Sequence, residues 1–162
     1  MEQMNMTDKK PYKSPRRRAR EFAVQALYQA ALNQKAAPEI ANYSREHTDF
    51  KRADSELFNQ LFFGALSNQV PYMMAIRPHL DRDEKLVNPI ERAILLMATH
   101  ELHAMPETPR AVVINEAIEI TKTFGGTDSH KFINSILDKI ADELAKNPPI
   151  FNNTSPDTEA AE

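Results

Sequence analysis

Cysteine is absent from this 162-residue chain, which excludes disulfides, thiolate metal ligands and a cysteine nucleophile. Only three glycines occur, so a phosphate-cradling glycine loop is also missing. No apolar run approaches the roughly 20 residues that span a bilayer, and the polar N-terminal stretch lacks the apolar core of a secretory signal. We therefore expect a cytoplasmic protein that is not an enzyme, has no cofactor or resident metal, and does not bind membranes.

Apolar residues recur at helical spacing along most of the chain, whereas alternation at period two is nearly absent. This pattern predicts an all-α fold, a compact bundle of six to seven helices. Proline directly after a capping residue marks three helix starts, at Ser14, Asn88 and Thr108. Pro71 is expected to kink or end a helix that starts near Asp54. The expected helices cover residues 15–33, 38–47, 54–70, a turn up to 80, a helix that opens at 88, residues 108–124, and a last helix that begins around 127–129.

The two ends of the chain differ in composition from its middle. Residues 1–13 are predicted to be a disordered basic arm, and the proline-punctuated residues 147–162 a disordered acidic tail. Residues 14–146 form the expected helical domain. The net charge of −3 divides unevenly, because residues 1–20 hold seven basic and two acidic groups (+5), which leaves −8 for the rest. This asymmetry indicates an anionic partner at the basic end and a basic partner elsewhere, unless the charges are merely solvated.

Four arginines occupy the first turns of the first expected helix, where the helix macrodipole disfavours cations by about 0.3–1 kcal/mol each. Stability alone would favour acidic residues there. A polyanion that uses guanidinium groups together with the helix N-terminus explains the pattern, and phosphate is the obvious candidate. The alternative is a frayed helix start with solvated arginines. The four candidates are Arg16, Arg17, Arg18 and Arg20.

Phe132 lies roughly 100° from the centre of the apolar stripe of the last helix and next to Lys131. An exposed aromatic ring beside a basic side chain is typical of base stacking on single-stranded RNA. The alternative, a residue of a second packing face, is equally compatible with the spacing.

Two other pairs of polar residues carry little chemical signal. His100 and His103 stand at i, i+3 without a third metal ligand, so we interpret them as ordinary histidines. Glu116 and Glu119 are interpreted as the solvated face of an amphipathic helix.

Three blocks resemble the NusB family of transcription antitermination factors: RRRAREFAVQALYQ, NPIERAILLMATHEL and VVINEAIEITKTFGGTDSHKFINSILDKIA. The resemblance implies two small helical subdomains. It also implies binding to the boxA element of nascent ribosomal RNA together with the ribosomal protein NusE, within a larger complex of other Nus factors and RNA polymerase.

The same resemblance assigns roles to individual residues. Arg16, Arg17, Arg18, Arg20, Lys131 and Phe132 match RNA-binding positions, and Tyr28, Glu91 and Asp128 match positions that affect the protein partner. Leu96 stands where the family usually has arginine.

Other readings of the sequence stay open. A similar domain opens certain ribosomal RNA cytosine methyltransferases, but this chain has no cofactor loop and no cysteine nucleophile. A helical interaction module with a basic arm is a third reading, and the sequence does not distinguish a monomer from a homodimer.

Overall fold

The computed structural model describes residues 12–124 and 128–148, and in these ranges the chain forms helices and their connections without a strand. This confirms the all-α prediction and the expected number of helices. No described helix is long and apolar enough to cross a membrane. The predicted arm and tail fall mostly outside the described ranges. The elements are α2 (Pro15–Leu32), α3 (Ala37–Arg45), η1 (Thr48–Arg52), α4 (Ser55–Ser67), α5 (Gln69–Ile76), η2 (Arg77–His79), η3 (Glu84–Leu86), α6 (Pro89–Ala104), α7 (Arg110–Phe124) and α8 (Ser129–Lys146).

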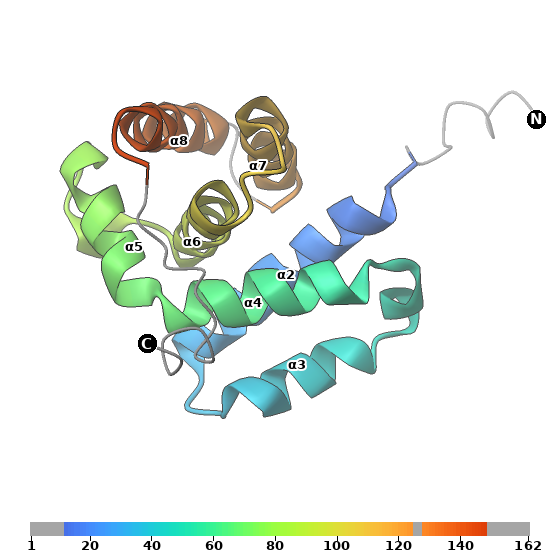
Figure 1. Ribbon diagram of the computed structural model, residues 1–162. Coiled ribbons are helices and arrows are strands. Elements are labelled where there is room, and N and C mark those ends of the chain that lie inside the picture. Colours follow the sequence, from blue (N-terminus) through green and yellow to red (C-terminus); the bar gives the residue numbers. More distant parts are fainter. Residues whose placement is uncertain (1–11, 125–127, 149–162) are drawn as a thin grey trace, which may run out of the picture.

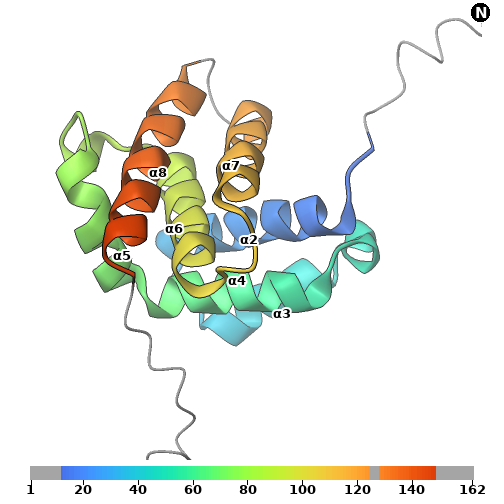
Figure 2. The same ribbon diagram turned by 45° about the horizontal axis from the view of Figure 1, so that its top comes forward.

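The helices divide into two groups that share one helix (Figures 1 and 2). Helices α2, α3 and α4 pack together on one side, and α5, α7 and α8 gather around α6 on the other. Helix α6 also contacts α2 and α4, so its apolar circumference is covered from both groups. This arrangement matches the two helical subdomains that the family resemblance implies.

The core is continuous across this junction. Phe58 and Phe62 of α4, Ile94 of α6, Ile120 of α7 and Ile133 of α8 are fully buried. The two phenylalanine rings stack with centroids 5.8 Å apart. Leu96, which takes the place of the family's usual arginine, is buried as well, so the apolar residue belongs to the core.

Two of the three predicted helix starts, at Ser14 and Asn88, are observed with their capping bonds. The third is displaced, because α7 begins at Arg110 and Pro109 precedes the helix instead of opening it. The Ser14 hydroxyl accepts a hydrogen bond from the Arg17 backbone N–H at 3.1 Å. At α6 the Asn88 side chain and the Glu91 carboxylate form a complete capping box. The prediction for Pro71 is wrong in position, because the chain breaks three residues earlier at Asn68. Pro71 lies in the first turn of α5, where a helix has no need of its missing N–H.

Candidate nucleic-acid interface

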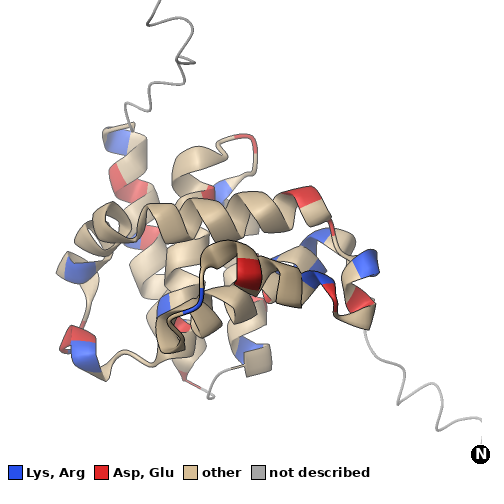
Figure 3. Ribbon diagram, turned by 90° about the horizontal axis from the view of Figure 1, so that it is seen from below, with Lys and Arg blue, Asp and Glu red and all other residues tan. Residues whose placement is uncertain are grey.

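The start of α2 carries the arginines, but acidic side chains lie among them. Figure 3 shows Lys and Arg segments intermixed with Asp and Glu segments where α2 begins, near the N-terminal trace. No acidic residue occurs in the first turn of α2 itself, so these carboxylates come mainly from other elements. The four arginines consequently have different environments and different capacities to bind an anion.

Arg16 and Arg18 remain available to a ligand. The Arg16 side chain is 48% exposed, and its Nη1 lies 3.6 Å from Oδ2 of Asp54, a long contact between exposed groups. Such a pair contributes little to stability and is easily exchanged. Arg18 is half-buried and makes no hydrogen bond or ion pair within the described part of the chain. Both side chains can therefore turn toward a phosphate group.

Arg20 is buried in the interior rather than at the surface. Its Nε donates to Oε1 of Glu101 at 3.0 Å and its Nη2 to Oε2 at 2.6 Å, with the two side chains 3% and 1% exposed. Its Nη1 lies 3.5 Å from Oε1 of Glu116. This corrects the expectation that all four arginines face the ligand. Arg20 joins α2 to α6 and α7 instead, because a buried guanidinium requires carboxylate partners.

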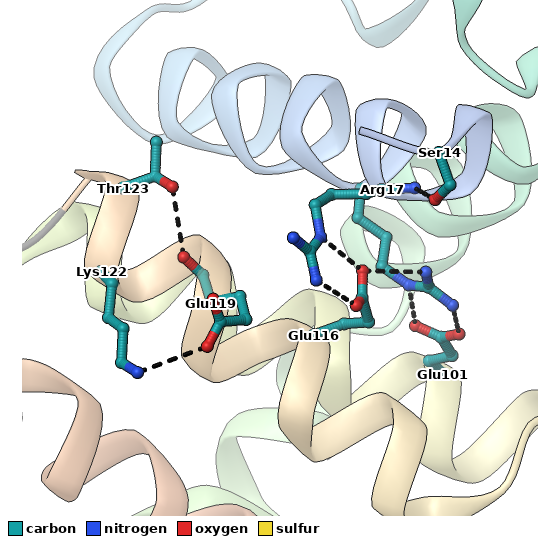
Figure 4. A network of polar contacts seen from close by, with 8 residues as sticks. Ser14, Arg17, Glu101, Glu116, Glu119, Lys122 and Thr123 are labelled. Carbon is teal, nitrogen blue, oxygen red and sulfur yellow. Dashed lines mark hydrogen bonds and ion pairs between the residues drawn. The ribbon is translucent and has the colours of Figure 1, made fainter. Parts of the chain in front are cut away.

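Arg17 is held by a second bidentate pair. Its Nε donates to Oε1 of Glu116 at 3.0 Å and its Nη2 to Oε2 at 2.6 Å (Figure 4). The hydrogen bond from Arg17 lowers the pKa of Glu116, and the same bond raises the pKa of Arg17. The interpretation of Glu116 as a solvated residue is therefore wrong. Glu119, one turn later, has a side chain that is 38% exposed, and its carboxylate forms an ion pair with Lys122.

A second candidate region lies at the start of α8. Phe132 is 8% exposed, because the guanidinium carbon of Arg82 sits 4.0 Å from the centroid of its ring. The ring also packs against the core, so the structure shows the second-packing-face alternative. Lys131 and Asp128 are exposed at its side. These residues border a depression of about 300 Å³, lined also by His79, Asp81, Ser135 and Lys139.

The candidate residues for the protein partner are not gathered in one place. Tyr28 on α2 is half-buried against the core. Glu91 is buried, and its Oε1 accepts the Asn88 backbone N–H at 3.1 Å, so its carboxylate is occupied by its own helix start. Asp128 is exposed at the first residue before α8 and forms no capping hydrogen bond with its side chain. It belongs to the depression beside Phe132.

The two histidines of α6 contact neighbouring protein groups. His100 Nδ1 lies 2.8 Å from the hydroxyl of Tyr72, and burial raises the pKa of that tyrosine to about 12. Burial lowers the pKa of His100 and of His103 below the ordinary value. Glycine is required at position 64, because a Cβ there would lie 2.2 Å from His100 Nε2. His100 therefore sits as a neutral residue in the packing between helices.

These features define an all-helical protein of two joined helix groups with an arginine-rich helix start. The chain matches the NusB family model over residues 17–142, and it belongs to that family. It is 64% identical to the transcription antitermination protein NusB of Neisseria gonorrhoeae strain NCCP11945 over 137 residues, which are 85% of this chain and 97% of that one. The NusB of Chromobacterium violaceum is 50% identical over 133 residues, 82% of this chain and 89% of its own length.

Solved structures agree on the fold. NusB of T. maritima superposes with a TM-score of 0.71 at 30% identity, covering 82% of this chain and 94% of the other. The NusB chain of a crystal structure of the antitermination factors NusB and NusE in complex with double-stranded RNA also gives 0.71, at 23% identity and over 78% and 96% of the two chains. The second likeness supports the fold alone.

Proposed function

We propose that this protein is a transcription antitermination factor that binds the boxA element of nascent ribosomal RNA together with NusE. The observation that carries the proposal is the helix start of α2, where Arg16 and Arg18 keep donors available beside a helix N-terminus. The name of a relative that is 64% identical, a transcription antitermination protein, supports it. Assembly with other Nus factors and RNA polymerase is part of the same proposal.

The RNA is proposed to contact two regions. Phosphate groups bind Arg16 and Arg18, which fixes the strand without reading its sequence. A base binds at the start of α8, where Lys131 supplies a further charge. There the base either replaces the Arg82 guanidinium on the Phe132 ring or stacks on the outer face of that guanidinium. Both are possible because a base and a guanidinium are planar groups that stack in the same way.

The protein partner is proposed to bind the acidic body of the molecule. Residues 21–162 carry a net charge of −8, which suits a basic ribosomal protein. Tyr28 and Asp128 have exposed atoms for direct contact, whereas Glu91 acts through the position of the first turn of α6.

The test is a fluorescence anisotropy titration of labelled single-stranded boxA RNA, with and without purified NusE, beside a scrambled RNA. We expect tighter binding to boxA and a further gain with NusE. Replacing Arg16 and Arg18 by alanine removes two phosphate contacts, so the slope of log K against log salt becomes shallower by about 1.4. Arg77→Ala is the matched control, because it removes an exposed arginine from another part of the molecule.

Equal binding to both RNAs without an effect of NusE would contradict the proposal. That outcome would leave a helical interaction module with a basic helix start, and proteins with acidic surfaces would then be the partners to examine.

A further inference from the structure

The carboxylate of Glu116 occupies the place that a phosphate would take at Arg17. We propose that Glu116 is an intramolecular competitor of the RNA backbone for Arg17, and that it limits how tightly this protein binds any nucleic acid. The inference rests on the RNA binding proposed above and names a residue that sets its strength.

The geometry supports direct competition. A guanidinium binds carboxylate and phosphate through the same fork of parallel N–H donors. Glu116 takes both donors of one edge of Arg17, at 3.0 and 2.6 Å (Figure 4). A phosphate oxygen pair that approached this edge would have to displace the carboxylate, and the two anions would repel each other at close range.

The burial of this pair is intermediate, which allows exchange. Arg17 and Glu116 are 27% and 14% exposed. The pair of Arg20 and Glu101 is too deeply buried to exchange its carboxylate for a ligand. The contact of Arg16 with Asp54 is long and solvent-accessible, so it does not fix the Arg16 side chain in place. Only the Arg17 pair, among the arginines of α2, is both firm and within reach of solvent.

The charges along this network alternate and cancel. Glu101, Arg20, Glu116 and Arg17 follow one another with contacts of 2.6 to 3.5 Å. Because the Arg17 hydrogen bond lowers the pKa of Glu116, that carboxylate is ionised at neutral pH. An approaching RNA backbone therefore meets Arg18 and the loosely paired Arg16, rather than the four arginines that the sequence shows.

The experiment compares Glu116→Gln with Glu119→Gln in salt titrations of single-stranded boxA RNA and scrambled RNA. Both variants remove one negative charge from α7, but Glu119 pairs with Lys122 and makes no hydrogen bond to Arg17. Freeing one phosphate contact steepens the log–log salt slope by about 0.7, so the affinity ratio of variant to wild type should be about fivefold larger at 0.1 M salt than at 1 M. We expect this gain for both RNAs with Glu116→Gln and no change of slope with Glu119→Gln.

A double variant separates competition from a structural effect. The gain of Glu116→Gln must vanish when Arg17→Gln is present as well, because the freed contact is then gone. Glu116→Asp keeps the charge, withdraws the carboxylate by one methylene and should give a smaller gain of the same sign. It also serves if urea unfolding shows that the glutamine variant is poorly folded.

The outcomes distinguish this inference from the proposed function. Wild-type protein that binds boxA while neither Glu116 variant binds more tightly than Glu119→Gln would overturn the competitor role only. Weaker binding by Glu116→Gln would show that the carboxylate orients Arg17 for RNA, which also overturns it. Wild-type protein that binds no RNA would refute both.

Discussion

Arg20 and Glu101 show how a charged residue can serve the interior of this molecule. Their bidentate contact joins α2 to α6 with almost no solvent access. Neither group can be left alone there, because an unpaired charge in a low-dielectric environment lacks the hydration that the pair replaces. The arginines of α2 therefore divide into two kinds. Arg20 stabilises the fold, whereas Arg16 and Arg18 are available to a ligand.

Removing one member of this pair is expected to be costly. Arg20→Ala or Glu101→Ala should lower the free energy of unfolding by about 3–5 kcal/mol, whereas Arg16→Ala should change it by less than about 1 kcal/mol. Arg20→Met combined with Glu101→Leu should lose much less than either single variant, since no charge is stranded. Urea unfolding followed by circular dichroism measures all four. A loss below about 1 kcal/mol for the single variants would show that water reaches the pair.

The helical register of Arg20 and Glu101 indicates that both are buried, although charged residues are normally expected at the surface. Arg20 precedes Ala23, Val24 and Leu27 by three, four and seven positions, and so shares their buried face. Glu101 follows Ile94 by seven positions in the same way. Helical register thus indicates the burial of both residues. It cannot indicate which carboxylate meets which arginine, because that depends on how α2, α6 and α7 pack.

At the scale of the element, short-range chemistry predicted most helix starts. Capping bonds need only residues within one turn, so Ser14 and Asn88 were recognisable from sequence. The break at Asn68 was not, because proline is compatible both with ending one helix and with the first turn of the next. The stacking of Arg82 on Phe132 could not be predicted either, since Arg82 lies 50 positions earlier, in the connection between η2 and η3.

The capping box of α6 allows the role of Glu91 to be tested. Glutamine also completes a capping box, so the free energy of unfolding of Glu91→Gln should be within about 0.5 kcal/mol of that of wild type. Glu91→Ala should lower it by about 0.5–2 kcal/mol. If Glu91 affects NusE only by fixing this turn, Glu91→Gln should bind NusE as wild type does. Calorimetry with purified NusE measures this. A loss of NusE affinity with unchanged stability would instead assign the carboxylate to direct contact.

At the scale of the whole molecule, α6 joins the two helix groups, and His100 lies at that junction. Its ring contacts Tyr72 of α5 and approaches Gly64 of α4, so a charge on it would disturb helices that belong to both groups. The core is shared across the junction, and we therefore expect the two groups to unfold together in one transition.

This position makes stability depend on pH with a definite sign. Burial lowers the pKa of His100 in the folded protein. At a pH between this lowered pKa and the ordinary histidine pKa, the unfolded chain is protonated at His100 and the folded chain is not. Stability should be full above about pH 7 and fall as the pH drops toward the folded pKa, with a limiting slope of about 1.4 kcal/mol per pH unit for each such histidine. The lowered pKa of Glu116 acts with the same sign but below its unfolded value of 4.5, outside this window.

The measurement is the urea midpoint of wild type and His100→Gln between pH 7.5 and 5.5. His103, whose pKa is also lowered, continues to titrate in the variant, so its pH dependence should weaken without disappearing. Identical pH dependence in the two proteins would mean that the His100 ring takes up its proton as readily when folded as when unfolded. The junction would then have to admit water around α6, and the single unfolding transition expected from a shared dry core would fail with it.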